Sequence, residues 1–258
     1  QGSSVIHLYS NSLSTLNISI PTLPEQKKIA HFFTTIDQKI NQLQEKKNAL
    51  EGYKKGMMQQ LFSQELQFKD ENGKTFDDWE VKKLGEVCEI NPKNKNLPNS
   101  FIYVDLESVE KGRLIKKNRM SIENSPSRAQ RLLSHKDILF QMVRPYQKNN
   151  YFFDEKSKDY VASTGYAQIR TNHNPIFIYQ LLHTQSFVNK VIVKCTGTGY
   201  PAINSTDLSK VIISLPSTRE QTKIANFLTK IDEKINAVNT QIENTKTYKK
   251  GLLQKMFV

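Results

Sequence analysis

Residues that could carry out catalysis are present in the sequence, but their spacing does not fit a catalytic site. Asn91-Pro92-Lys93 lacks the second proline and the aromatic residue of an amino-methyltransferase motif. Gly197-Thr198-Gly199 is glycine-rich, yet it does not follow a predicted strand and open a helix, as a dinucleotide-binding loop must. The sequence therefore predicts neither a methyltransferase centre nor a cofactor site.

Acid–lysine triplets of the kind that nucleases use occur at Asp154-Glu155-Lys156 and Glu80-Val81-Lys82. Because 24% of the residues are charged, such triplets arise by chance, and we interpret both as solvated loops. The histidines lack the spacing of metal ligands. They are His7, His31, His135, His173 and His183. We therefore predict no catalytic residue and no metal site.

Basic residues are concentrated in one segment. Residues 111–148 contain ten basic and two acidic residues, a net charge of +8 within a chain of net charge +12. Five of the ten are arginines, whose planar guanidinium groups suit phosphate and base contacts. They are Arg113, Arg119, Arg128, Arg131 and Arg144. This pattern favours a nucleic-acid partner, and a lysine-rich solvated surface is the alternative.

An internal repeat flanks this basic segment. Residues 21–62 and 216–257 share 19 of 42 identities at a constant offset of 195, without a gap. The shared residues include Tyr53-Lys54-Lys55-Gly56 and its counterpart Tyr248-Lys249-Lys250-Gly251. Two copies of one element are therefore present.

Each copy has the pattern of a long helix. Thr22-x-x-Glu25 and Ser217-x-x-Glu220 fit a capping box at the helix start. Behind each box, apolar residues alternate by three and four positions, which is typical of a coiled-coil seam. We expect two helices of roughly 55–60 Å that pack antiparallel. The seams are Ile29, Phe33, Ile36, Ile40, Leu43, Lys47, Leu50, Lys54, Met57 and Leu61, and Ile224, Leu228, Ile231, Ile235, Val238, Ile242, Thr245, Lys249, Leu252 and Met256.

Between the helices the sequence predicts a body of mixed α and β structure, so the fold class is α+β. A polar linker over 64–78, with a turn at Asn72-Gly73, precedes this body. We expect a helix over 81–90 and another that opens at Asn174-Pro175. The predicted strands are 101–104, 137–143, 151–153, 167–169 and 211–215.

The first twenty residues repeat the end of this body. Gly2-Ser3-Ser4 and Ile18-Ser19-Ile20-Pro21 stand at the same offset from Gly197-Thr198-Gly199 and Ile213-Ser214-Leu215-Pro216. We expect them to be the remnant of an earlier body domain, in a chain that is a fragment or a natural half-size subunit. No apolar run is long enough for a membrane span and no signal peptide is visible, so we expect a cytoplasmic protein. Cys88 and Cys195 are predicted to be reduced.

In this order, several short motifs and the duplicated helix resemble the specificity subunits of type I restriction–modification enzymes. The resemblance covers nearly the whole chain, and the order of the motifs is more specific than any one of them. The motifs are Trp79 to Ile90, Ser127-Arg128-Ala129, Asp137-Ile138-Leu139, Val143-Arg144-Pro145-Tyr146, Ala162-Ser163-Thr164-Gly165-Tyr166, Gly197-Thr198-Gly199-Tyr200-Pro201 and the Pro-x-x-x-Glu-Gln helix starts.

The resemblance implies a particular domain organisation. In that family two target recognition domains alternate with two long helices, which pair antiparallel and set the distance between two DNA half-sites. On this chain the layout gives a remnant at 1–20, a spacer helix at 21–63, a linker at 64–78, a target recognition domain at 79–215 and a second helix at 216–258. Because only one recognition domain is complete, a homodimer is one way to restore the repeat.

The resemblance also implies partners. These are double-stranded DNA, methyltransferase subunits that use S-adenosylmethionine, and restriction subunits that use ATP, so the chain itself is a non-catalytic reader. We predict that the outer helix faces bind the methyltransferase through Tyr53, Lys54, Lys55, Tyr248, Lys249 and Lys250. Lys54 and Lys249 fall on the seams, where they set the register or snorkel to solvent, with a salt bridge to a partner as the alternative.

For DNA we expect two kinds of contact. Arg128 and Arg144 belong to motifs shared by domains that read different sequences, which favours phosphate positioning or loop fixing. Base reading is expected from the loops beside them, at Lys148-Asn149-Asn150, Asn118-Arg119 and Tyr200. The full predicted set is Arg119, Arg128, Arg131, Arg144, Lys148, Asn149, Asn150, Gly165, Tyr166, Lys194, Thr198 and Tyr200.

Two other functions fit parts of the sequence. A coiled-coil scaffold would bind only protein and would carry its basic body for solubility. A stand-alone DNA-binding regulator would bind DNA without a methyltransferase. Salt-dependent binding to a duplex distinguishes the first, and co-purification with a methyltransferase distinguishes the second.

Overall fold

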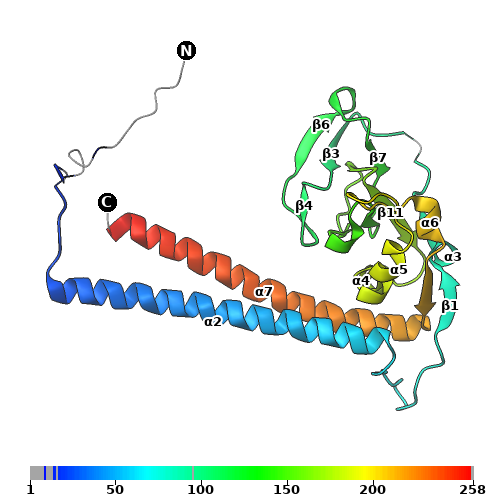
Figure 1. Cartoon of the computed structure of the whole chain (residues 1–258), viewed down its shortest axis with the longest axis horizontal. Coiled ribbons are helices and arrows are strands. Elements are labelled where there is room, and N and C mark those ends of the chain that lie inside the picture. Colours follow the sequence, from blue (N-terminus) through cyan, green and yellow to red (C-terminus); the bar gives the residue numbers. More distant parts are fainter. Residues whose placement is uncertain (1–8, 10–13, 16, 95, 257–258) are drawn as a thin grey trace. The chain divides into compact units, whose positions relative to one another are not determined.

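The computed structural model describes residues 9, 14–15, 17–94 and 96–256. It divides into two compact units, one formed by the described parts of 1–49 and 235–258 and the other by residues 50–234. Two long helices run through both units: α2 (Leu23–Phe62) and α7 (Thr218–Met256) (Figure 1). The predicted counterpart of the 197–199 loop, at residues 2–4, lies outside the described residues.

Polar contacts within each unit show that α2 and α7 are antiparallel. In the first unit Lys249 Nζ lies 2.6 Å from Asp37 Oδ1, and Lys47 Nζ donates to Asn239 Oδ1 at 2.8 Å. In the second, Lys54 Nζ lies 2.7 Å from Asp232 Oδ1. Each ion pair joins the first half of one helix to the second half of the other, and the Lys47–Asn239 contact lies near the middle of both, as the antiparallel seams predicted.

The two ion pairs are copies of each other. Lys54 and Lys249 are repeat equivalents, and so are Asp37 and Asp232. Each lysine binds the aspartate of the other copy. The charge of each seam lysine is therefore already paired within the chain, and a role in setting the register remains a prediction that these pairs support.

The helix starts differ from the predicted capping boxes. In the second copy Ser217 Oγ accepts from the Glu220 amide at 3.4 Å, but the Glu220 carboxylate accepts from Trp79 Nε1 at 3.1 Å. Half of the reciprocal box is thus replaced by a contact with the body. Both helix starts share one hydrogen bond, from a glutamine side chain to the carbonyl of the proline five residues earlier. Gln26 Nε2 donates to Pro21 O and Gln221 Nε2 to Pro216 O, each at 2.7 Å.

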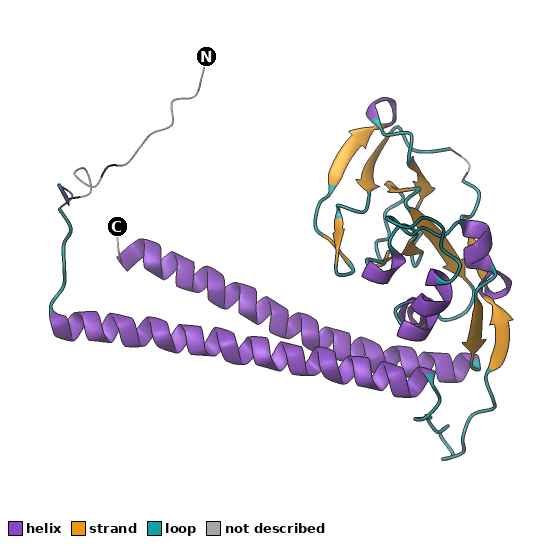
Figure 2. Ribbon diagram, viewed as in Figure 1, coloured by secondary structure: helices purple, strands orange, loops and turns teal. Residues whose placement is uncertain are grey.

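Two four-stranded sheets form the body (Figure 2). The first has the order β6 (Asn118–Ser121), β3 (Ser100–Val104), β10 (Tyr160–Ser163) and β7 (Ala129–Leu132). The second has the order β2 (Cys88–Ile90), β11 (Tyr166–Thr171), β8 (Ile138–Gln141) and β9 (Tyr151–Phe152). The β3–β10 pair is parallel and the other pairs are antiparallel.

Two short antiparallel pairs complete the strands. They are β1 (Glu80–Lys83) with β12 (Ile212–Leu215), and β4 (Val109–Glu110) with β5 (Arg113–Leu114). The main apolar core takes residues from both large sheets, so it lies between them. Its members are Ile102, Val104, Val109, Leu133, Leu139, Tyr151, Phe153, Tyr160, Ala162 and Tyr166.

The short helices are α3 (Leu84–Val87), α4 (Pro175–Leu182), α5 (Gln185–Ile192) and α6 (Ser205–Ser209), with 3-10 turns η1 (Ile122–Asn124) and η2 (Pro145–Gln147). The predicted start of α4 is confirmed, because Asn174 Oδ1 accepts from the amides of Ile176 and Phe177. The predicted helix over 81–90 is wrong in extent, because only α3 is helical there. Its ends pair instead with β12 and β11, which leaves Val81 70% exposed.

Aromatic side chains hold the body to the helices within the second unit. Phe62 at the end of α2, Trp79 before β1 and Phe177 in α4 have ring centroids 5.4 to 6.1 Å apart. Gln180 Nε2 adds a bond of 2.9 Å to Asp232 Oδ2, the carboxylate that also binds Lys54. The Asp232 carboxylate thus accepts hydrogen bonds both from the body and from the lysine of the other long helix.

The segment predicted as a linker packs along α7 in the same unit. Phe68 makes an edge contact with Phe227, with centroids 5.7 Å apart, and Lys223 Nζ donates to Lys69 O at 2.7 Å. At the Asn72-Gly73 turn, Asp70 Oδ1 accepts from the amides of Asn72 and Lys74, each at 2.8 Å. The turn prediction is confirmed.

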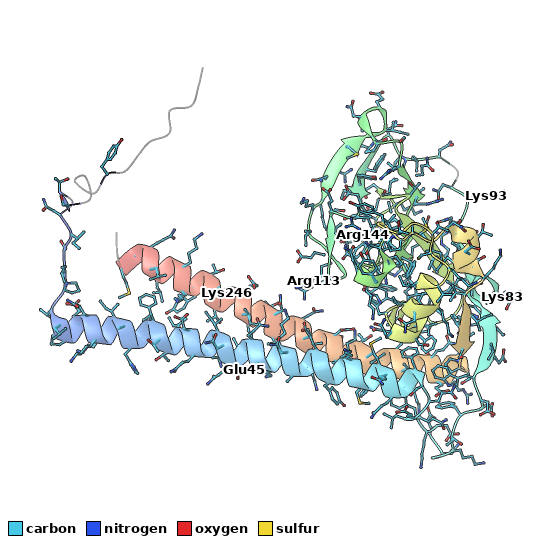
Figure 3. The ribbon with its side chains drawn as sticks, in the orientation of Figure 1. Glu45, Lys83, Lys93, Arg113, Arg144 and Lys246 are labelled. Carbon is cyan, nitrogen blue, oxygen red and sulfur yellow. The ribbon has the colours of Figure 1, made fainter. Side chains whose placement is uncertain are left out.

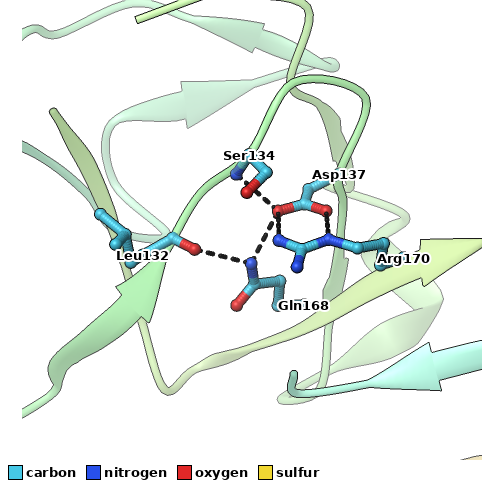
Figure 4. Close-up of polar contacts among 5 residues, drawn as sticks. All are labelled: Leu132, Ser134, Asp137, Gln168 and Arg170. Atoms are coloured by element: carbon cyan, nitrogen blue, oxygen red, sulfur yellow. Dashed lines mark hydrogen bonds and ion pairs between the residues drawn. The ribbon is translucent and has the colours of Figure 1, made fainter. Parts of the chain in front are cut away.

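An ion pair on a buried carboxylate lies within the sheet that contains β11 and β8, and Gln168 links it to β7 of the other large sheet (Figure 4). Asp137, which is fully buried before β8, binds Arg170 of β11 through two bonds of 2.8 Å. Gln168 Nε2 donates to the same carboxylate at 2.7 Å and to Leu132 O at 2.8 Å. The bond to Asp137 raises the pKa of Arg170. This carboxylate is structural.

We expect Asp137→Ala to lower the free energy of unfolding by about 3 kcal/mol, because it leaves Arg170 and Gln168 without their acceptor. Glu155→Ala is the control, since it removes the exposed pair with Lys117 and should cost under ~0.5 kcal/mol. Urea denaturation of both variants measures the difference. Equal losses would contradict a structural role for Asp137.

Candidate nucleic-acid interface

Two loops of the second unit lie together, and we call them the paired loops: residues 143–150 and 195–202. The Arg144 amide donates to Pro201 O at 2.7 Å, and Val143 forms a β-bridge with Ala202. The second loop closes on itself through reciprocal bonds of 2.9 and 3.0 Å between Thr196 and Ala202. Backbone hydrogen bonds therefore join the two loops to each other.

One glycine is required in this framework. Gly197 has a φ of +90°, and a Cβ there would lie 3.1 Å from Tyr200 O. The turn of the loop itself therefore requires glycine at this position.

Arg144 lies at the meeting point of the paired loops (Figure 3). Its backbone is left-handed, with a φ of 53°, and its guanidinium carbon is 4.1 Å from the centre of the Tyr200 ring. Tyr200 is itself 66% exposed. Among the described residues no carboxylate lies within ion-pair distance of Arg144. A cation held on an exposed ring, with its N–H groups free of an acid, is suited to bind an anion.

Other predicted residues border Arg144. Lys148, also left-handed, donates from Nζ to Gln185 Oε1 at 3.0 Å. Lys194 and Thr198 are exposed in or beside the second loop. Tyr146 is 51% exposed in the first loop. It belongs to a sequence motif but was not among the predicted DNA contacts, although an exposed aromatic beside an arginine is a signal for base or sugar contact.

The prediction that Asn149 and Asn150 read bases is contradicted by their positions. Asn150 is 1% exposed, and its Oδ1 accepts from the Gln141 amide at 2.9 Å. Asn149 Nδ2 donates to Val109 O at 2.6 Å and to Leu106 O at 3.3 Å. Both amides satisfy backbone groups of β8 and of the β4 region, so they hold the loop and leave no edge for a base.

Tyr166 and Gly165 also belong to the fold. Tyr166 is fully buried, its hydroxyl has no partner among the described residues, and burial raises the pKa of that hydroxyl. The Gly165 carbonyl accepts from the Met142 amide at 3.1 Å, and a Cβ on Gly165 would meet Leu106 at 3.4 Å. The motif that contains both residues forms the tight turn between β10 and β11. The prediction that Tyr166 contacts DNA is therefore wrong for this structure.

Three predicted arginines lie on the β6–β3–β10–β7 sheet and not on the paired loops. Arg119 forms an ion pair with Asp159. Arg131 is half-buried, and burial lowers its pKa. Arg128 is exposed, and its carbonyl accepts from the Thr164 amide at 2.9 Å. Of the three, Arg128 has the most accessible charge.

The outer helix faces carry charged residues such as Glu45 and Lys246 (Figure 3). Of the predicted partner-binding residues, Tyr53 and Tyr248 are 52% and 58% exposed, and Lys55 and Lys250 are exposed. Lys54 and Lys249 differ, because their ammonium groups bind Asp232 and Asp37.

An apolar groove of about 410 Å³ lies in the first unit, beside the start of α2. Ile29, Ala30 and Phe33 line it, and they are the repeat equivalents of Ile224, Ala225 and Leu228. The latter three are at most 1% exposed in the second unit, where the body covers α7. The same three repeat positions are therefore buried in the second unit and line an open groove in the first.

Comparison with known proteins identifies the family. The family model described as "Type I restriction modification DNA specificity domain" matches residues 1–52 and 76–245. The chain belongs to this family. The resemblance inferred from the motifs is therefore confirmed.

Curated relatives in this family include two type I specificity subunits. The HindI specificity subunit of Haemophilus influenzae is 26% identical over 65% of this chain and 38% of its own length. The MjaVIII specificity subunit of Methanocaldococcus jannaschii is 25% identical over 98% of this chain and 64% of its own length. This chain thus spans between about two fifths and two thirds of these relatives.

Solved specificity subunits share the mixed helix and sheet architecture. The HsdS subunit from Thermoanaerobacter tengcongensis is 27% identical, with a TM-score of 0.55 over 69% of this chain and 48% of that one. The S subunit from M. genitalium is 15% identical, with a TM-score of 0.59 over 92% of this chain and 62% of that one, and shows the fold alone.

The part of the chain that the structure describes has neither a cluster of metal ligands nor a membrane-spanning helix. No group of three histidine, cysteine or acidic side chains there is arranged to hold a metal ion. No helix there combines the length and the apolar character of a membrane span.

His183 beneath the paired loops gives a pH prediction. Burial lowers its pKa to about 4, with smaller contributions from its bond to Tyr179 O and from the charges of Lys54, Lys148 and Asp232. The unfolded state takes up a proton near pH 6.5 and the folded state does not. The contribution of neutral His183 to the free energy of unfolding is therefore fully present above about pH 6.5 and is lost as the pH falls towards 4.

We expect the free energy of unfolding to be about 2 kcal/mol lower at pH 5 than at pH 7 from this group alone. His183→Gln should flatten that part of the profile, whereas the exposed His135→Gln should leave it unchanged. Denaturant titrations at a series of pH values measure both. A His183→Gln profile as steep as that of the parent chain would contradict the assignment.

Proposed function

We propose that this chain reads one half of a bipartite DNA target through the paired loops. The observation that carries the proposal is Arg144, stacked on the exposed ring of Tyr200 where two backbone-bonded loops meet. Membership of the DNA specificity domain family and the net charge of +8 over 111–148 support it.

The two residues take different roles in this proposal. Arg144 binds a phosphate, because its backbone is held by the second loop and its charge has no acid partner among the described residues. Tyr200 and Thr198, at the exposed tip of the second loop, contact base edges or sugars. The base-reading role predicted for Asn149 and Asn150 moves to this tip.

We further propose that the outer helix faces bind methyltransferase and restriction subunits, which carry out the chemistry. In this role the chain is non-catalytic and needs no cofactor of its own. The family supports this role, and so does a similar solved structure that concerns complex assembly of the type I R-M system. Tyr53 and Tyr248 are the best docking candidates, since each presents an exposed aromatic surface at an equivalent position.

The groove in the first unit fits this organisation. Its lining is equivalent to the surface that the recognition domain covers on α7, so a second recognition domain is the occupant that the repeat favours. That domain comes from the same polypeptide or from another subunit, and a homodimer of half-size subunits is one such arrangement.

Duplex binding at several salt concentrations tests the reading role. We expect Arg144→Ala to weaken binding to all sequences and to reduce the slope of log affinity against log salt by about 0.9, the value for one lost phosphate contact. Arg219→Ala, an exposed arginine in the first turn of α7, is the matched control and should leave the slope unchanged.

Other outcomes would revise the proposal. An unchanged slope with lost sequence preference would make Arg144 a base reader. A parent chain without salt-dependent duplex binding would instead favour the coiled-coil scaffold.

Docking should be separable from reading. We expect the double variant Tyr53→Ala/Tyr248→Ala to elute apart from the methyltransferase in size-exclusion chromatography, with duplex binding retained. Arg144→Ala should show the reverse behaviour. Failure of the parent chain to co-purify with any methyltransferase would support the stand-alone regulator.

A further inference from the structure

A buried glutamine connects the two ends of the first of the paired loops. Gln141, the last residue of β8, is 3% exposed and stands just before this loop. Its side-chain Nε2 donates to Gln147 Oε1 at 2.8 Å, and its Oε1 accepts from the Asn149 amide at 3.1 Å. Its own backbone amide donates to Asn150 Oδ1 at 2.9 Å. The strand that leads into the loop is thus bonded to the residues that leave it.

The backbone of this loop needs such support. Arg144 and Lys148 each have a φ of 53°, and the turn η2 lies between them. Residues other than glycine rarely occupy this left-handed region, so two of them four positions apart persist only where surrounding contacts hold them. The bonds within the turn, from the Gln147 amide to Arg144 O and from the Lys148 amide to Pro145 O, are local. The side chain of Gln141 joins the turn to the sheet.

We propose that Gln141 is a positioning residue for DNA binding. Its side chain holds the turn so that Arg144 keeps its place on the Tyr200 ring, 4.1 Å from the ring centre, before DNA arrives. This inference rests on the proposed function, because Gln141 is buried and acts through Arg144. The apparent affinity of a site falls with the fraction of molecules in which the site has its binding conformation. A loop released from Gln141 must regain the left-handed turn on binding, and the duplex then binds more weakly through the same contacts.

A double-mutant cycle between Gln141 and Arg144 tests this role. The full chain is titrated with a fluorescent duplex at several KCl concentrations, using Gln141→Met, Arg144→Ala and the double variant. We expect Gln141→Met to weaken binding about 5-fold with an unchanged salt slope, because the complex still forms every phosphate contact. In the Arg144→Ala background the same change should weaken binding less than about 2-fold, since the residue that Gln141 positions is absent.

Two further variants separate positioning from a general loss of stability. Gln168→Met is the matched control, because Gln168 is a fully buried amide whose bonds go to Asp137 and Leu132 and not to the loop. It should destabilise the chain in urea and bind the duplex as the parent does. Gln147→Ala removes the exposed partner of the Gln141 side chain and leaves the core intact. It should weaken binding about 2- to 3-fold, and add no loss to that of Gln141→Met.

The outcomes distinguish this inference from the proposed function. If Gln141→Met binds as the parent does, or weakens binding equally with and without Arg144, the inference fails and Gln141 serves the fold alone. An equal loss of binding in Gln168→Met would also overturn it, because destabilisation would then explain both. Should Gln141→Met not fold, Gln147→Ala decides, and binding equal to that of the parent overturns the inference. Each of these results leaves the reading role standing, which fails instead if Arg144→Ala and the parent bind the duplex alike.

Discussion

One ion pair, formed twice, determines much of this structure. Lys54 with Asp232 and Lys249 with Asp37 place a lysine of each helix against the aspartate of the other, at positions that the internal repeat makes equivalent. A lysine on an apolar seam is tolerated only where it has such a partner, so the pair fixes one antiparallel register. In the second unit the same Asp232 accepts from Gln180 of the recognition domain, which ties domain position to helix register.

The arginines of this chain differ in role because the groups around their guanidinium ions differ. Arg170 binds the fully buried Asp137 carboxylate through two bonds, within the sheet that contains β11 and β8. Arg144 has an aromatic ring and no described acid, and its backbone is left-handed, a conformation that costs a non-glycine residue about 1 kcal/mol. The fold balances the first charge and leaves the second for a ligand. Arg119 lies between these cases, since it is exposed but paired with Asp159.

The helices could be predicted from the sequence because their information is local and duplicated. The repeat indicated the two elements, their seams and the lysines that set the register. Residues whose role depends on distant backbone groups could not be predicted in the same way. Asn149 and Asn150 have the composition of a base-reading loop, and only the amide of Gln141 and the carbonyl of Val109 reveal their structural use. Val81 shares the helical spacing of Leu84 and Val87, but Glu80–Lys83 pairs with Ile212–Leu215, and only Leu84–Val87 is helical. Arg144 and Tyr200 were both predicted from the sequence as DNA contacts, but their contact with each other, across 56 positions, was not.

The backbone bonds of the paired loops have an evolutionary consequence. Arg144 N with Pro201 O, and Thr196 with Ala202, hold the framework without using the side chains at its tip. Thr198 and Tyr200 can therefore be replaced while the loops, the sheets beneath them and the helix pair stay as they are. Under the proposed function, a lineage could thus acquire a new target by single substitutions, with the proposed partner-binding faces of the helices left unaltered. Such a frame lets recognition diverge quickly on an unchanged scaffold.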